Sequence, residues 1–262
     1  DEIGPAALKL FYTVHVTVMP ALFLFLLAYH FWRVRKAGGL VVPPRMKDTA
    51  EETPVRVATI PHLIVRELAV AAVLLAGLLL LAVIFDAPLH APANPGLSPN
   101  PTKAPWYFAG LQELLLHLHP LFAVFIVPLV AAAALLTLPY LRYETDTGGV
   151  WFASRTGRIA GIVAASVALV ITPVLILLDD WLTHPGNRFS DIPAVIGDGL
   201  IPFVFLLAAI ALIYRMLRRR FSASRNETIQ AVFIFLLAAF IIMTITGVWF
   251  RGAGMQLVWP WL

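Results

Sequence analysis

Six long apolar stretches dominate the chain, and polar connections separate them. Each stretch comes close to the roughly 20 apolar residues that an α-helix needs to cross a bilayer. The pattern therefore predicts an all-α integral membrane protein with about six transmembrane helices. The predicted spans are residues 9–32, 68–86, 120–141, 158–178, 199–217 and 227–249.

The composition strengthens this prediction. Of the 262 residues, 60% are hydrophobic and only 13% are charged, whereas about 25% of the residues in soluble proteins are charged. An ordinary soluble domain is therefore excluded. The chain has no cysteine, which excludes disulfides, thiolate ligands and thioether attachment of a cofactor.

The positive charges are sorted between the two sides of the predicted bundle. All but four of the 19 Lys and Arg residues lie in, or next to, the loops 33–67, 142–157 and 218–226. The exceptions are Lys9, Lys103, Arg188 and Arg251. By the positive-inside rule the basic loops are cytoplasmic, which places both termini on the non-cytoplasmic side. The excess of Lys and Arg over Asp and Glu thus reflects the orientation of the chain in the membrane. We therefore expect a lipid membrane as a partner, and no nucleic acid.

The beginning of the chain suggests an upstream portion. It starts at Asp1 without a methionine, and no basic segment followed by a short apolar core marks a secretory signal. Because the first span begins outside, we expect that an N-terminal portion is missing or is carried by another chain.

Within the first span, the run Phe11–Trp32 is apolar, carries no charge and contains two histidines. His15 and His30 are 15 positions apart, which on an α-helix means about 22 Å along the axis and about 60° in azimuth. An imidazole in lipid must find a partner. An iron at each end of the helix would supply one, and hydrogen bonds to neighbouring helices are the alternative. The spacing alone leaves both interpretations open.

An aromatic segment follows the second span. A proline-rich loop between 86 and 103 cannot form a regular helix, and it leads into Lys103-Ala104-Pro105-Trp106-Tyr107-Phe108. By itself this segment is also typical of an aromatic belt at the membrane surface.

Together the two features resemble the cytochrome b family. The helix with Phe11-Tyr12, His15 and His30-Phe31-Trp32, which ends near Gly38-Gly39, looks like the fourth helix of cytochrome b. Asn100-Pro101-x-Lys103-Ala104-Pro105-Trp106-Tyr107-Phe108 looks like that family's Pro-Glu-Trp-Tyr loop at the quinol-oxidation site. The resemblance covers about residues 1–217, namely the fourth helix and the C-terminal half, which is similar to subunit IV of cytochrome bc-type complexes.

The resemblance divides the chain into four parts. Residues 1–36 would be a helix of the haem bundle, and residues 37–67 a cytoplasmic connection. Residues 68–217 would be cytochrome b C-terminal-like helices with an outer quinol loop at 87–119. Residues 218–262 add a helix and a tail, which look like those of an extended bacterial variant in a prokaryotic cytoplasmic (inner) membrane.

The resemblance implies two haems b with one axial ligand each from this chain. His15 would ligate the low-potential haem near the outer side, and His30 the high-potential haem near the cytoplasmic side. In the family each iron takes its second histidine from another helix, and no second pair with matching spacing occurs here. A second cytochrome b-like chain or a missing upstream part must supply the partners. The other histidines, interpreted as loop or interfacial polar residues, are His62, His90, His117, His119 and His184.

The outer loop departs from the family motif. Ala104-Pro105 replaces Pro-Glu, so the carboxylate that takes a proton outward is absent. Glu113 is the nearest candidate replacement as a base, and stabilising the start of its helix through the dipole is the alternative. Pro105, Trp106 and Tyr107 would contact the outer quinone.

Three acidic residues elsewhere carry further expectations. Arg66-Glu67 stands where the family has a Lys-Asp pair, so Glu67 would hydrogen-bond the inner quinone while Arg66 supplies positive charge. An ordinary interfacial ion pair is the alternative. Asp179 and Asp180 end the fourth span, and a solvated helix end is favoured over a proton relay.

The predicted function is that of a cytochrome b-type subunit of a membrane quinol oxidoreductase, inactive alone. It would move electrons across the membrane between two haems b and quinone or menaquinone sites on either side. The resemblance implies iron–sulfur and/or cytochrome c partner subunits. The alternative is a haem-free membrane anchor that docks a redox enzyme. A transporter is disfavoured because no paired short, Gly/Pro-interrupted spans occur in two halves.

Overall fold

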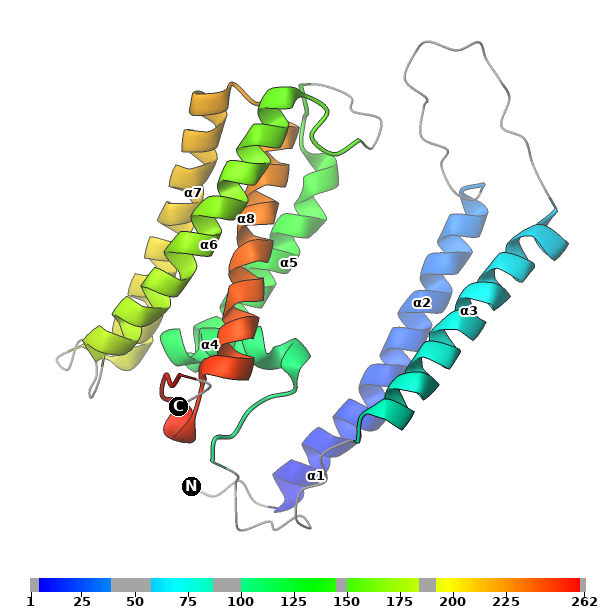
Figure 1. The fold of residues 1–262 in the computed structure, drawn as a ribbon, viewed down its shortest axis with the longest axis horizontal. Coiled ribbons are helices and arrows are strands. Elements are labelled where there is room, and N and C mark those ends of the chain that lie inside the picture. Colours follow the sequence, from blue (N-terminus) through cyan, green and yellow to red (C-terminus); the bar gives the residue numbers. More distant parts are fainter. Residues whose placement is uncertain (1–4, 39–57, 87–99, 145–149, 184–191, 260–262) are drawn as a thin grey trace. The chain divides into compact units, whose positions relative to one another are not determined.

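A computed structural model describes residues 5–38, 58–86, 100–144, 150–183 and 192–259 (Figure 1). These residues are helical and contain no β-strand, apart from one isolated bridge between Arg251 and Leu257. The predicted all-α fold is therefore confirmed.

Six helical segments are long and apolar enough to cross a membrane, as predicted. They are Lys9–Lys36, Thr59–Ile84, Leu121–Tyr140, Arg155–Trp181, Val195–Phe221 and Arg225–Phe250. The α-helices are α1 (Pro5–Thr13), α2 (Met19–Lys36), α3 (Thr59–Ile84), α4 (Ala109–His117), α5 (Val127–Thr137), α6 (Arg155–Thr183), α7 (Ile201–Phe221) and α8 (Arg225–Ile245). Short π turns, η1 (Val14–Val18), η3 (Leu121–Ile126), η5 (Val195–Leu200) and η6 (Thr246–Phe250), extend four of the spans. Five of the six spans exceed the predicted ones because their ends include polar residues, which reach from a helix end into water, whereas Leu121–Tyr140 is slightly shorter than the predicted 120–141.

Three of the π turns have a common cause in the sequence. η1, η3 and η5 each end two residues before a proline, at Pro20, Pro128 and Pro202. Proline has no N–H, so the carbonyl four residues earlier loses its α-helical donor. In each turn the residue just before the proline donates instead to the carbonyl five residues back, which is the π-helical pattern. The prolines thus widen the helices without interrupting them.

The chain divides into two compact units, Asp1–Asp48 and Thr49–Leu262. In the first unit, α1, η1 and α2 form one continuous helix whose described side chains are almost all exposed. In the second unit, α3 is also exposed along its length. Apolar surface of this extent requires lipid or partner helices around it.

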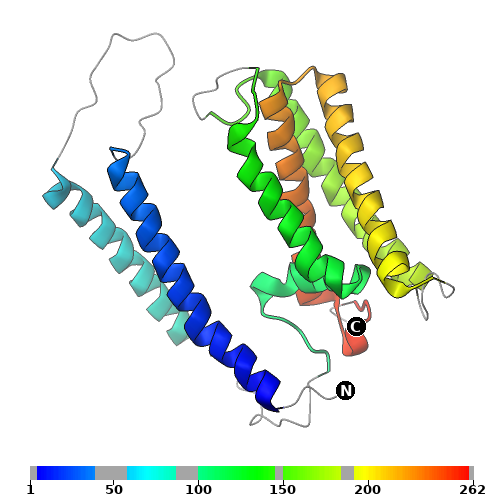
Figure 2. The same cartoon turned by 180° about the vertical axis from the view of Figure 1, so that it is seen from behind.

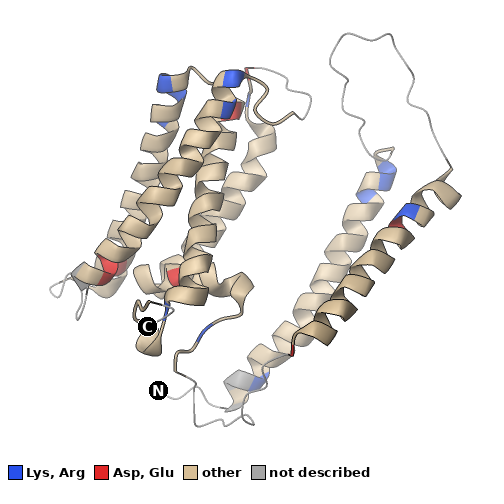
Figure 3. Cartoon of the chain, viewed as in Figure 1, with Lys and Arg blue, Asp and Glu red and all other residues tan. Residues whose placement is uncertain are grey.

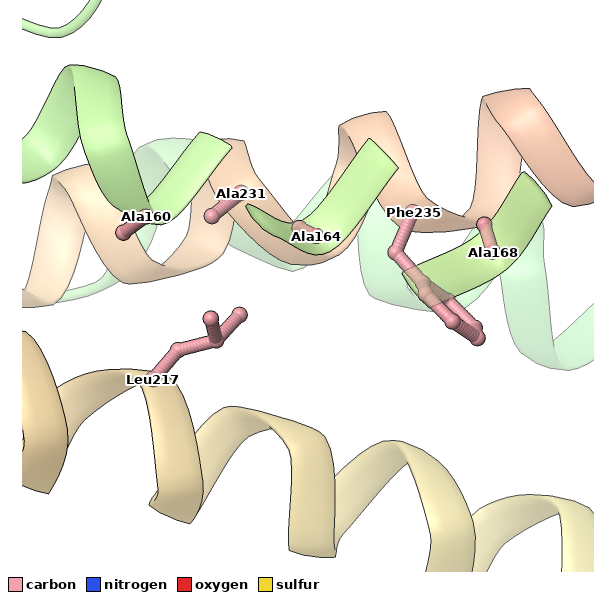
Figure 4. Packing of buried hydrophobic residues seen from close by; sticks show 6 residues of the cluster. All are labelled: Ala160, Ala164, Ala168, Leu217, Ala231 and Phe235. Carbon is pink, nitrogen blue, oxygen red and sulfur yellow. The ribbon is translucent and has the colours of Figure 1, made fainter. Parts of the chain in front are cut away.

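The core of the second unit lies between α6, α7 and α8 (Figure 4). Ala160, Ala164 and Ala168 are spaced by four residues along α6 and are fully or almost fully buried against α8 and Leu217 of α7. Such small residues let membrane helices approach closely. α4 is too short to span a membrane and lies across one end of this bundle (Figures 1 and 2).

Glycines permit the close contact between α4 and the end of α8. A Cβ on Gly110 would lie 2.6 Å from Thr244 Oγ1, and a Cβ on Gly247 would lie 2.9 Å from the carbonyl oxygen of Ala109. A backbone atom cannot move aside as a flexible side chain can, so the Gly247 position needs a residue without Cβ. This contact fixes α4 against the end of α8.

The opposite end of the bundle carries most of its positive charge (Figure 3). There a capping box begins α8: the Ser224 side chain accepts a hydrogen bond from Glu227 N, and the Glu227 carboxylate accepts one from Ser224 N. Glu227 Oε1 also accepts a hydrogen bond from Ser154 N at 2.7 Å, which fastens the start of α6 to α8. The charge distribution agrees with the predicted orientation, and the assignment of sides stays a prediction.

Candidate functional site

The segment 100–108, which carries the predicted outer motif, is held in a defined conformation. Gln112 of α4 accepts a hydrogen bond from Ala104 N and donates one to the Thr102 carbonyl, both at 2.7 Å. Lys103 Nζ donates to the Val248 carbonyl at 2.9 Å, and Asn100 Oδ1 accepts from Gly254 N at 2.6 Å. The segment is therefore fixed both to α4 and to the chain that follows α8.

Trp106, Tyr107 and Phe108 form a 3₁₀ turn after Pro105, here called the aromatic turn. The rings of Trp106 and Tyr107 meet edge to face at 5.6 Å between centroids, and those of Tyr107 and Phe108 are 4.9 Å apart. All three residues are at least half exposed. The turn offers exposed aromatic rings that are inclined to one another by 86° and 57°, which suits an interfacial belt and equally contact with the ring of a quinone.

Glu113 lies in the second turn of α4 and is completely buried. Arg251 binds its carboxylate with two nitrogens: Nε donates to Oε2 at 3.0 Å and Nη2 donates to Oε1 at 2.5 Å. This is the bidentate geometry of strong charge-assisted pairs. The alternative that Glu113 merely stabilises the start of its helix is wrong, because it lies beyond the first turn and binds Arg251.

Arg251 connects three parts of the chain. It is 2% exposed, and besides Glu113 its Nη1 donates to Asp180 Oδ1 at 2.9 Å and to the Met255 carbonyl at 3.0 Å. The bridge with Leu257 holds the backbone of Arg251 in place. From the sequence, Arg251 is one of the four cations predicted to lie outside, and no local pattern indicates a role for it.

His117 joins the same group one helical turn after Glu113. Its Nε2 lies 3.2 Å from Glu113 Oε1, and its Nδ1 lies 2.6 Å from Asp179 Oδ2 at the end of α6. Asp179 and Asp180 are 18% and 24% exposed in their side chains and are ion-paired. Both carboxylates thus keep part of their exposure to water but, unlike those of a freely solvated helix end, are held by cationic side chains. We call Glu113, His117, Asp179, Asp180 and Arg251 the charged cluster.

The cluster sets the protonation of its two members on α4. Burial by itself raises the pKa of Glu113, but the hydrogen bonds with His117 and Arg251 outweigh it, so this pKa is lowered. Burial by itself lowers the pKa of His117, but the hydrogen bonds with Asp179 and Glu113 outweigh it, so this pKa is raised. With His117 protonated, two positive charges face three carboxylates.

The predicted haem ligands lie in the first unit. His15 is in the π turn η1 and His30 is in α2, and both are exposed. Within the described residues, neither imidazole makes a hydrogen bond. The π turn shifts the register of His15 from that of a regular α-helix. The angle between His15 and His30 around the helix axis that was calculated for a regular α-helix therefore does not apply. Both residues nevertheless lie on one continuous helix.

The predicted inner quinone residues lie near the beginning of α3. Arg66 and Glu67 are both exposed. Adjacent positions on a helix do not face each other, which disfavours the alternative of an ion pair between these two. Both side chains are therefore free to meet a ligand or another subunit.

The structure brings together some of the predicted site residues. Pro105, Trp106 and Tyr107 directly precede the helix that carries Glu113, in the second unit. Among the described residues, no group of three or more His, Asp or Glu side chains could hold a metal ion by itself.

The comparisons with known proteins bear on the histidine helix. Residues 1–92 match the family model described as Cytochrome b(N-terminal)/b6/petB. This part of the chain is similar to the N-terminal part of cytochrome b and cytochrome b6. The match contains α1, α2 and α3 with His15, His30, Arg66 and Glu67, and it indicates a cytochrome b-type redox subunit of a membrane complex. It spans 92 of the 262 residues, so the resemblance of residues 93–217 to the C-terminal half of cytochrome b stays a prediction. No curated protein and no solved structure matches the chain.

Proposed function

We propose that the chain is a cytochrome b-type subunit of a membrane quinol oxidoreductase, in which electrons cross the membrane between two haems b and quinone sites on either side. The observation that carries this proposal is the pair His15 and His30. Both are exposed on one continuous helix inside the cytochrome b match, and neither has a hydrogen-bond partner among the described residues.

The residues of the first unit fit the ligation of haem. An imidazole without a partner in an apolar helix is available as an axial ligand, and the two positions lie about 22 Å apart along the axis. When bound, haem b carries single electrons through the change in oxidation state of its iron. The helix contributes one ligand at each end, so a second cytochrome b-like chain or an upstream part supplies the others. Loss of haem from the His15→Ala and His30→Ala complexes tests this.

The outer quinone site would lie at the aromatic turn. The rings of Trp106 and Tyr107 with Pro105 would hold the quinone head group, and Glu113 would accept a proton from the quinol. The support is that the segment 100–108 is anchored to α4, so that its conformation is fixed relative to Glu113. The electrons would leave towards iron–sulfur and/or cytochrome c subunits, and the quinone would be menaquinone or a related quinone of a prokaryotic cytoplasmic membrane.

The inner quinone site would lie at the start of α3, with Glu67 donating a hydrogen bond and a proton. In the purified complex, Glu67→Gln is expected to lower the rate of quinone-dependent reoxidation of the haems about tenfold or more, because an amide cannot transfer a proton. Stopped-flow spectroscopy of the haem bands measures this rate.

Asp86→Asn is a matched control, because Asp86 is an exposed acidic residue just beyond the other end of α3. It is expected to leave reoxidation unchanged. Equal rates for wild type and Glu67→Gln at unchanged haem content would remove Glu67 from the inner site.

A further inference from the structure

The charged cluster contains a chain of hydrogen bonds that leads from a buried to an accessible carboxylate. The Glu113 side chain is 0% exposed, that of His117 16% and that of Asp179 18%. His117 directs one ring nitrogen to each carboxylate, Nε2 to Glu113 and Nδ1 to Asp179. An imidazole in this position can take up a proton at one nitrogen while it releases another from the opposite nitrogen.

We propose that His117 relays protons from Glu113 to Asp179 and thereby to the non-cytoplasmic side during quinol oxidation. The inference rests on the proposed function, in which Glu113 accepts the proton. The O–H bond of the quinol breaks, and its proton passes to Glu113 and then to His117 Nε2. His117 Nδ1 gives its own proton to Asp179 Oδ2, which releases it to water. Once the neutral imidazole has returned to the tautomer with its proton on Nδ1, the second proton follows the same route. The two electrons leave to haem b and to the one-electron acceptor of a partner subunit.

The surroundings of Glu113 favour transfer over storage of the proton. Arg251 and His117 hold the carboxylate ionised, so a proton that arrives there is passed on. The charge of Arg251 is itself balanced by Asp180. Among the described residues, the charged groups that contact His117 or Glu113 include Asp179 at the end of α6 and Arg251 after α8, and Arg251 also contacts Asp180. The ring of His117 contacts both Glu113 and Asp179.

His117→Asn in the purified complex, driven by menadiol or a short-chain ubiquinol, tests the relay. The rate of quinol-dependent haem reduction is expected to fall about a hundredfold at unchanged haem content, and added imidazole is expected to restore part of it. A purely structural role of His117 would not give recovery by free imidazole.

His119→Asn is the matched control two residues further along. His119 Nδ1 accepts a hydrogen bond from Leu121 N, and an asparagine oxygen can accept the same bond from a backbone N–H two residues on. This variant removes an imidazole close to the end of α4 but leaves His117 in place. The rate of haem reduction by quinol in this variant is expected to equal that of the wild type.

The pH profile provides an independent readout. The relay needs a neutral His117 to receive the next proton, and the hydrogen bonds with Asp179 and Glu113 outweigh burial and raise the pKa of His117. The wild-type rate is therefore expected to rise as the pH increases through this raised pKa, and to fall below it. In His117→Asn this limb of the profile is expected to disappear.

Two results would overturn the relay. The first is a His117→Asn complex that holds its haem and oxidises quinol at the wild-type rate. If that variant does not assemble, Asp179→Asn decides, because it should show the same slowing without recovery by imidazole, and a wild-type rate there contradicts the relay. A wild-type complex that contains both haems but reduces neither with quinol would instead contradict the proposed function itself.

Discussion

Replacing Arg251 by methionine is expected to destabilise the folded bundle by about 3–5 kcal/mol. The change leaves the completely buried carboxylate of Glu113 without its bidentate partner, and it removes the contacts of Arg251 with Asp180 and the Met255 carbonyl. A buried charge without compensation is costly because protein does not replace the lost water. The midpoint of unfolding in detergent, by heat or denaturant, measures the loss.

Two further variants separate the ion pair from general effects of the substitution. Arg218→Met removes an exposed pair with Glu144 and is expected to cost much less, since solvent screens such pairs. The double variant Arg251→Met, Glu113→Gln should lose less stability than the sum of the single variants, because the second change removes the orphaned charge. Strict additivity would show that the two residues are not coupled.

His15→Ala and His30→Ala are each expected to halve the haem content of the purified complex, from two haems b to one. Each substitution removes the axial ligand that we propose for that end of the helix, while the other histidine lies about 22 Å away along the axis and is unaffected. Quantification of extracted haem per complex measures the result.

His62→Ala is the control for these variants. His62 lies in α3, outside the histidine helix, and is exposed, so the complex is expected to keep both haems. If the His15→Ala and His30→Ala complexes both keep two haems, these histidines do not bind iron and are structural. This result would favour the alternative in which this chain itself binds no haem and acts as a membrane anchor.

The helical fold could be predicted from the sequence because length and hydrophobicity alone define membrane spans. All six spans were predicted, and their ends differ mainly where polar residues continue a helix. The π turns before Pro20, Pro128 and Pro202 were not predicted. Their cause is nevertheless local, because each proline removes one backbone donor, and the same rule applies to other chains.

The charged cluster could not be predicted in the same way. It joins residues 62 positions apart, His117 and Asp179, and 138 positions apart, Glu113 and Arg251. Such pairs depend on how α4, α6 and the segment after α8 meet, which no local pattern shows. One signal was present: Glu113 and His117 are spaced as neighbours on a helix face, and both precede an apolar span.

The reduced-minus-oxidised spectrum of the purified wild-type complex, recorded during a redox titration, tests the two-haem assignment most directly. We expect two b-type components with different midpoint potentials, since the two ends of the histidine helix place the haems in different surroundings. A spectrum without any b-type component in an intact complex would contradict the account and leave a haem-free membrane anchor.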